Sequence, residues 1–336
     1  MRLKNFIFSA LALASVATFA NEDKNAKIKQ INQEIQTLQE GSKAKKKPSK
    51  ATKQKISLLK ANKKVIEKEA ELNKMFSAFD VVKSKSPRKV LIYSRTTGFR
   101  HGSIEMGAVL LQQLGDKTGA YTSVHTEDEA MFNDAELAKY DVILMLSTTR
   151  NPIASPKARA AFEKFMASDK GLVGIHAATD CHKDWPNYLE AMGGIFDGHP
   201  WGGGDKVTIY NEDPDHVCAK MVPQGFVIQD EIYQYKDDKY FTRDKMRVLL
   251  SLDLSGPNMM KNKKKMKRKD NDYAVSWLRS FTGSKVFYTN LGHNDATFMN
   301  PVAMQHILTG IQYAAGDIEA DATPSAKLGK FPKAVK

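Results

Sequence analysis

Apolar residues between positions 88 and 177 form two alternating patterns along the chain. Short continuous apolar runs predict buried strands over residues 89–94, 121–126, 141–147 and 171–177. Stretches with apolar residues three and four positions apart predict helices over 103–114 and 155–168. Continuous apolar strands that alternate with amphipathic helices are typical of a mostly parallel α/β sheet with helices on both faces.

The pattern changes after Gly194, where predicted strands follow one another without intervening helices. These strands comprise residues 206–211, 225–235, 247–254, 273–278 and 285–293. A final helix with one apolar face is expected over 301–315. We therefore predict one α/β domain over residues 88–320, with an inserted or appended antiparallel part and a C-terminal tail at 321–336.

The first twenty residues have the pattern of a secretory signal. Arg2 and Lys4 precede an uncharged run of 15 residues that ends in small side chains. This predicts a signal peptide over 1–20, cleaved after Ala20. An uncleaved anchor is the alternative, but the run is shorter than the roughly 20 residues that cross a bilayer. We expect a periplasmic or secreted protein.

Residues 21–87 predict a basic helical arm. Helical spacing of apolar residues on both sides of Gly41 and Pro48 indicates two helices, arranged as a hairpin or a short coiled coil. Of the net charge of +13, residues 21–89 supply +11, with 19 Lys and Arg against 8 Asp and Glu, and Arg2 and Lys4 supply the rest. Residues 90–336 carry 30 charges of each sign. The arm is either a solvated spacer or a contact to a membrane surface or envelope polymer. Nucleic acid is not expected, because no aromatic residues interleave the lysines.

A second basic run, residues 261–269, lies between two predicted strands. It is expected to form an exposed loop, either solvated or in contact with a polyanionic polysaccharide.

The chain has two cysteines, Cys181 and Cys218. In an oxidising compartment they form either a disulfide or two free thiols, and the sequence leaves both open. Two cysteines are too few for a zinc site made of thiolates.

Polar residues collect where the predicted strands end or in the loops between them. The titratable members of this set are His101, His176, Asp180, His199, Glu231 and His293. Three aromatic residues, Trp185, Trp201 and Tyr233, lie close to them along the chain. Ligands of open α/β sheets bind beyond the carboxyl ends of the parallel strands, so these residues are expected to share one site. The structural alternative for each residue is a helix cap, a packed core side chain or an exposed strand position.

Two kinds of chemistry fit a carboxylate with several imidazoles. In the first, His176, Glu231 and His293 are catalytic acid and base groups. The substrate is then bound by His101, Asp180, His199, Trp185, Trp201 and Tyr233. In the second, a divalent metal polarises a carbonyl or activates water, and zinc, manganese or iron suits such ligands. The ligands of that metal would be His101, His176, His199, Glu231 and His293.

Six motifs occur in order along the chain: GFRHGS, GLVGIHAATD, GGIFDGHP, DPDHV, DEIY and KVFYTNLGH. Together they resemble the trehalose-utilisation (ThuA-like) family over about residues 88–316. The resemblance implies the class I glutamine amidotransferase-like fold with a flavodoxin-like sheet. It also implies a role in the catabolism of sugars, including disaccharides oxidised to keto-sugars. The prominent positions of the family fall on His101, His176, His199, Asp230, Glu231 and His293.

The amidotransferase relatives of this family carry a nucleophilic cysteine at a tight turn between a strand and a helix. Here that stretch reads Gly-Ile-His-Ala-Ala over 174–178, without a thiol or hydroxyl group. A covalent acyl-enzyme is therefore not expected. The family pattern also leads us to expect a proline shortly before Trp277, but the chain reads Tyr-Ala-Val-Ser-Trp over 273–277.

These features together predict an exported carbohydrate-processing enzyme. It would be a hydrolase, lyase or isomerase that acts on a sugar, keto-sugar or glycoside. The alternative is a non-catalytic sugar-binding or envelope scaffold protein.

Overall fold

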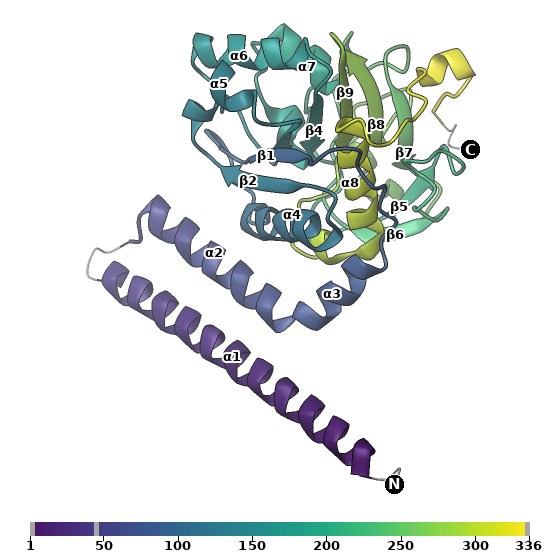
Figure 1. The fold of residues 1–336 in the computed structure, drawn as a ribbon. Helices are drawn as coiled ribbons and strands as arrows, with labels where there is room; N and C mark the ends of the chain where they lie inside the picture. The colour runs from purple at the N-terminus through teal and green to yellow at the C-terminus, as the bar shows by residue number, and fades with distance from the viewer. Residues whose placement is uncertain (1–3, 44–46, 258, 333–336) are drawn as a thin grey trace. The chain divides into compact units, whose positions relative to one another are not determined.

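The computed structural model describes residues 4–43, 47–257 and 259–332 (Figure 1), without the side chains of residues 4–21, 43 and 262. The chain divides into two compact units, residues 1–74 and 75–336.

The first unit is helical. It contains α1 (Lys4–Lys43), α2 (Lys50–Glu67) and the start of α3 (Glu69–Ser77). Contacts between Glu34 and Lys55 at 2.7 Å, and between Lys24 and the Glu67 carbonyl at 3.0 Å, show that α1 and α2 run antiparallel as a hairpin. Ser49 begins α2, and its hydroxyl accepts a hydrogen bond from the backbone N–H of Thr52.

The predicted signal segment, residues 1–20, falls at the start of α1. Its first three residues and its side chains lie outside the described part of the chain. Among the residues that the structure describes, no helix has both the length and the apolar character needed to cross a membrane. Cleavage after Ala20 and export stay predictions.

The described part of the second unit contains one nine-stranded sheet in the order β2-β1-β3-β4-β9-β8-β7-β5-β6. The strands are β1 (Lys89–Tyr93), β2 (Thr122–Thr126), β3 (Val142–Leu146), β4 (Gly171–Ile175), β5 (Lys206–Asn211), β6 (Phe226–Gln229), β7 (Arg247–Leu252), β8 (Ala274–Phe281) and β9 (Ser284–Thr289). The first four strands and β9 are parallel, and the remaining strands extend the sheet in antiparallel fashion. The predicted α/β sheet with an antiparallel part is confirmed.

Helices cover both faces of the sheet (Figure 1). The α-helices are α4 (Ile104–Thr118), α5 (Asp134–Leu137), α6 (Pro156–Met166), α7 (Pro186–Met192) and α8 (Pro301–Ala314). Helices α5, α6 and α7 lie on one face, and α4 and α8 lie on the other. Every residue of β3 and β4 is therefore buried, which explains their uninterrupted apolar sequences.

Short 3-10 helices and a packed tail complete the second unit. The 3-10 helices are η1 (Glu129–Met131), η2 (His176–Asp180), η3 (Met259–Lys265), η4 (Thr297–Met299) and η5 (Ser325–Leu328). The hydroxyl of Ser325 accepts a hydrogen bond from the backbone N–H of Val248, so the tail packs on β7. Before β1, the backbone N–H of Asp80 donates to Gln305 of α8. The segment that precedes β1 thus belongs to this unit.

Several predicted strands end earlier than expected. The strand predicted over 225–235 stops at Gln229. At the next residue, the Asp230 carboxylate accepts the backbone N–H of Glu231 and interrupts the regular pairing. Beyond it, Ile232 and Tyr235 form isolated bridges to the loop before β5. The strand predicted over 285–293 stops at Thr289. The strand predicted over 171–177 stops at Ile175, because His176 takes a positive φ of 50°.

Both cysteines are free thiols in the structure. The thiol of Cys181 lies 3.1 Å from the Thr148 hydroxyl, and Cys218 is also buried. Of the two alternatives that the sequence left open, the structure has the unpaired one.

Candidate active site

Four titratable side chains from distant segments meet beyond the carboxyl ends of the parallel strands. They are His101, His176, Glu231 and His293, called the His/Glu cluster below. Each offers one nitrogen or oxygen atom, and these four atoms all lie within 4.8 Å of one another. The ring of His101 lies 4.6 Å from that of His176 and 5.2 Å from that of His293, measured between centroids. His101, His176 and His293 follow β1, β4 and β9, so the parallel register brings them to one edge.

His176 occupies a sharp turn directly after β4. Its φ of 50° is uncommon for a residue other than glycine, and such conformations concentrate at functional sites. The Nδ1 atom lies 2.8 Å from the backbone carbonyl of Asn290. Because a carbonyl can only accept, Nδ1 carries a proton, and Nε2 faces the cluster.

Glu231 joins three histidines through its two carboxylate oxygens. Oε1 lies 3.2 Å from Nδ1 of His293 and 3.6 Å from Nε2 of His176. Oε2 lies 3.4 Å from Nδ1 of His199. Burial raises the pKa of Glu231, but the hydrogen bonds and charges of His176 and His293 outweigh it and hold the pKa well below its ordinary value. Glu231 is therefore an ionised carboxylate.

The two outer imidazoles of the cluster differ in their preferred charge. Burial, together with the neighbouring His176 and His293, lowers the pKa of His101 to about 2, so this ring is neutral. Burial also lowers the pKa of His293, but the hydrogen bond to Glu231 outweighs it and the pKa lies above its ordinary value. Nε2 of His101 lies 3.3 Å from the hydroxyl of Tyr233. The buried Nδ1 of His101 has no hydrogen-bond partner among the described residues.

Asp230 fixes the two loops that carry Glu231 and His293. Its Oδ2 accepts hydrogen bonds from the Gly292 backbone N–H at 2.7 Å and the Thr297 hydroxyl at 2.9 Å. Its Oδ1 accepts from the backbone N–H groups of Glu231 and Asn294. The carboxylate is fully buried, and burial raises its pKa, while these four donors stabilise its ionised form. Asp230 is thus a positioning residue of the site.

A family model described as trehalose utilisation, ThuA, matches residues 89–314. The chain belongs to the ThuA family. All four residues of the His/Glu cluster lie within the match, which confirms the resemblance seen in the six sequence motifs.

Solved structures of ThuA-like proteins share this fold. A ThuA-like protein from Bacteroides uniformis ATCC 8492 is 26% identical, with a TM-score of 0.56 over 70% of this chain and 95% of that protein. A ThuA-like protein from Parabacteroides merdae ATCC 43184 is 16% identical, with a TM-score of 0.51 over 74% of this chain and 93% of that protein. Among curated proteins, none matches this sequence significantly.

His199 lies at the open side of the ThuA-family site. Its side chain is 51% exposed, while Nδ1 faces Glu231. Its ring stacks on Phe196 at 6.2 Å between centroids, and Phe196 in turn packs on Tyr233 at 4.3 Å. The structure therefore brings His199 and Tyr233 to the edge of the His/Glu cluster, where a substrate would arrive.

The glycine-rich turn at 202–204 packs directly on His293. A Cβ atom on Gly203 would lie 2.7 Å from the His293 ring, whereas a Cβ atom on Gly204 meets nothing within 4 Å. We expect Gly203→Ala to displace His293 and reduce turnover about 10- to 100-fold, because small misplacements of catalytic groups are costly. Gly41→Ala is the control and should retain activity, because a Cβ atom there also meets nothing within 4 Å. Steady-state kinetics of both variants check this, and equal activities would contradict it.

Three predicted substrate-binding residues do not join the site. Asp180 pairs with Lys183 at 2.8 Å. Trp185 is 5% exposed and donates to Glu163, and fully buried Trp201 donates to the carbonyl of Met259. Both indoles fill the protein interior, so the predicted binding of substrate by either ring does not fit the structure.

Phe99 is a site residue that the sequence analysis missed. Its ring is 66% exposed and meets the edge of the His101 ring at 4.8 Å between centroids. An aromatic side chain between Gly98 and His101, in the turn after a buried strand, was the available signal. Exposed aromatic faces beside a catalytic group are suited to stacking on sugar rings.

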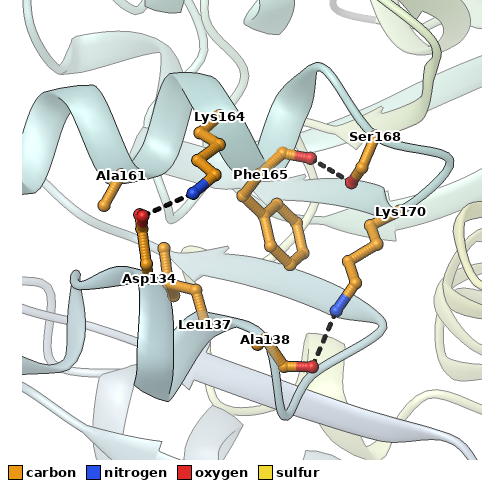
Figure 2. Close-up of a pocket in the computed structure, with 8 residues that line it drawn as sticks. All are labelled: Asp134, Leu137, Ala138, Ala161, Lys164, Phe165, Ser168 and Lys170. Carbon is orange, nitrogen blue, oxygen red and sulfur yellow. Dashed lines mark hydrogen bonds and ion pairs between the residues drawn. The ribbon is translucent and has the colours of Figure 1, made fainter.

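A separate cavity of about 210 Å³ lies between α5 and α6 (Figure 2). Lys164 pairs with Asp134 at its rim, and the Ser168 hydroxyl donates to the carbonyl of Phe165. No residue of the His/Glu cluster lines it. Its polar groups are paired, so we place no chemistry there.

Proposed function

We propose that this ThuA-family protein is an exported carbohydrate-processing enzyme that acts on a sugar, keto-sugar or glycoside. The reaction is a hydrolysis, elimination or isomerisation at the His/Glu cluster. The observation that carries the proposal is the convergence of three imidazoles and one carboxylate from four separate segments, with His101, His176 and Glu231 buried. Burying such groups is costly unless they are paired or bind a metal, and buried groups with strongly shifted pKa values cluster at functional sites. The family description, trehalose utilisation, supports a sugar as substrate.

The cluster suits a divalent metal ion such as zinc, manganese or iron. Nδ1 of His293 lies 3.2 Å from Oε1 of Glu231 and 3.2 Å from Nε2 of His176. Oε1 of Glu231 lies 3.6 Å from Nε2 of His176. Ligand atoms about 2.1 Å from one ion lie roughly 3.0–3.4 Å apart in octahedral or tetrahedral shells. His176 also makes the hydrogen bond to a backbone carbonyl that metal-binding histidines commonly make through their second nitrogen. The partnerless Nδ1 of His101 fits the same assignment.

Bound at the cluster, such an ion supplies a Lewis acid for a sugar carbonyl or lowers the pKa of a water. His101, His176, Glu231 and His293 are its proposed ligands. Glu231 Oε2 orients His199, whose half-exposed ring then exchanges protons with the substrate. In the metal-free alternative, His176, Glu231 and His293 transfer the protons themselves, with ionised Glu231 as base and His293 as acid.

Phe99 is proposed as the stacking surface for the sugar ring. We expect Phe99→Ala to raise KM about tenfold, or ~1.4 kcal/mol, with kcat little changed, because stacking contributes to substrate and transition state alike. Phe331→Ala is the matched control, since Phe331 is also 66% exposed. Kinetics on the same sugar check this. A KM that changes equally in both variants would contradict the stacking role.

The function is tested by incubating the full-length protein with disaccharides, including trehalose, and with their keto derivatives. Zinc, manganese and iron are supplied in turn, and products are read by proton NMR. Conversion that stops on chelation and returns with the metal is the expected result. Binding of sugars without conversion under any condition favours the alternative, a non-catalytic sugar-binding or envelope scaffold protein. In that case the basic arm, residues 21–87, would supply the contact to envelope polymer or membrane.

A further inference from the structure

A groove of about 370 Å³ lies beside the glycine-rich turn. It is lined by Gly204, Lys206, Thr208, Val227, Pro257 and Lys261. Lys206 is exposed, and Val227 is 53% exposed. The groove therefore combines ammonium groups, a hydroxyl and a small apolar surface, which is a mixture suited to a charged sugar.

The groove borders the glycine-rich turn that packs on the candidate active site. The backbone of Gly203 packs on the ring of His293, and the next residue, Gly204, lines the groove. The side chain of Asn294 donates to the carbonyl of Gly203 at 2.8 Å and holds this turn in place. No side chain projects from Gly202 to Gly204, so this turn puts no side chain between the His/Glu cluster and the groove.

The segment that follows Pro257 concentrates positive charge at the same place. Lys261 pairs with Asp205, whereas Lys263, Lys264 and Lys265 are exposed and make no ion pair among the described residues. Residues 90–336 as a whole carry 30 charges of each sign, this segment included, so the segment is a local excess of positive charge. Clustered lysines raise the local concentration of anionic ligands.

The basic segment is anchored against the active-site loop. Gln234 is buried next to Tyr233, and its Nε2 donates to the carbonyls of Asp197 and Lys265 at 3.1 and 3.0 Å. Its Oε1 accepts from the backbone N–H of Lys267 at 2.8 Å. One buried amide therefore clamps the lysine segment to the loop that carries His199. An independent solvated loop would need no such connection.

We infer that this groove and the lysine segment bind an acidic group of the carbohydrate substrate, either a uronate carboxylate or a sulfate ester. The inference rests on the proposed function and narrows its substrate to acidic glycans. Lys206 and Lys261 line the groove, and the exposed Lys263 to Lys265 follow Lys261 along the chain.

The test is calorimetric binding of three tetrasaccharides to the full-length protein: an oligogalacturonate, a sulfated carrageenan fragment and uncharged cellotetraose. At low salt, one acidic chain should bind at least tenfold more tightly than cellotetraose, and the advantage should shrink as salt is added. The preferred acidic chain identifies the charged group. Equal affinities for acidic and neutral chains would overturn the inference.

A variant pair separates this surface from general electrostatics. The variant Lys206→Ser/Lys263→Ser/Lys264→Ser should lose at least tenfold in affinity for the acidic chain and keep its affinity for cellotetraose. The control Lys117→Ser/Lys157→Ser/Lys220→Ser removes three exposed lysines elsewhere and should change both affinities less than twofold. Equal losses of affinity in both variants would refute binding of the acidic chain at the groove. Turnover of neutral sugars would then still support the proposed function, whereas absence of all sugar binding would overturn both.

Discussion

Glu231→Gln is expected to remove metal binding and turnover while leaving the protein folded. Glu231 contacts His176, His199 and His293 through its two carboxylate oxygens. Glutamine keeps the shape but not the charge. Turnover should fall at least about 1,000-fold, or ~4 kcal/mol. Zinc affinity should fall more than about 100-fold, because mutation of residues that only hydrogen-bond to metal ligands already lowers metal affinity about 10- to 100-fold. Kinetics and zinc titration measure the two effects.

The matched control for this variant is Glu190→Gln. Glu190 accepts hydrogen bonds from buried Arg279 at 2.7 Å and from Lys245 at 2.9 Å, outside the cluster. This change should lower the free energy of unfolding by ~1–3 kcal/mol without affecting zinc affinity, because Arg279 loses its counter-charge. Glu231→Gln should show the opposite pattern. Full activity in Glu231→Gln, or unfolding in place of a loss of chemistry, would contradict the role of Glu231.

Asp230→Asn is expected to give the largest loss of stability. Asp230 is the acceptor in all four of its hydrogen bonds. In asparagine, the amide nitrogen would replace one oxygen and face two of these donors. The free energy of unfolding should fall by ~2–5 kcal/mol, since buried donors lose their acceptor. Activity should fall as well, because the loops of Glu231 and His293 lose their shared anchor.

Denaturant unfolding of Asp230→Asn and of Asp180→Asn measures this difference. Asp180 makes a partly exposed pair with Lys183, so its replacement should cost less than about 0.5 kcal/mol. Equal and small losses in the two variants would show that Asp230 does not fix the loops.

Much of the fold could be predicted because its strands have unusual sequences. The runs at 141–147 and 171–177 contain little polar alternation, and only strands covered on both faces have that pattern. The segment after Gln229 could not be predicted in the same way. It continues the alternation of a strand, but the carboxylate of Asp230 takes backbone N–H groups from residues more than 60 positions away.

The convergence of the histidines could be predicted from the strand order, whereas the burial or exposure of the aromatic side chains could not. His101, His176 and His293 each follow a parallel strand, so their meeting depends on strand order alone. Trp201 is fully buried and donates to the carbonyl of Met259, 58 positions along the chain, whereas Phe99 is 66% exposed. Local sequence carries neither fact.

The His/Glu cluster as a metal centre is tested most directly by a crystal structure of the full-length protein soaked in zinc. Anomalous diffraction would be recorded at the zinc absorption edge. The expected result is one peak at about 2.0–2.2 Å from His101, His176, His293 and Glu231. Absence of a peak among these four side chains at full zinc saturation, or imidazole rings that point to different sides of the domain, would contradict the assignment.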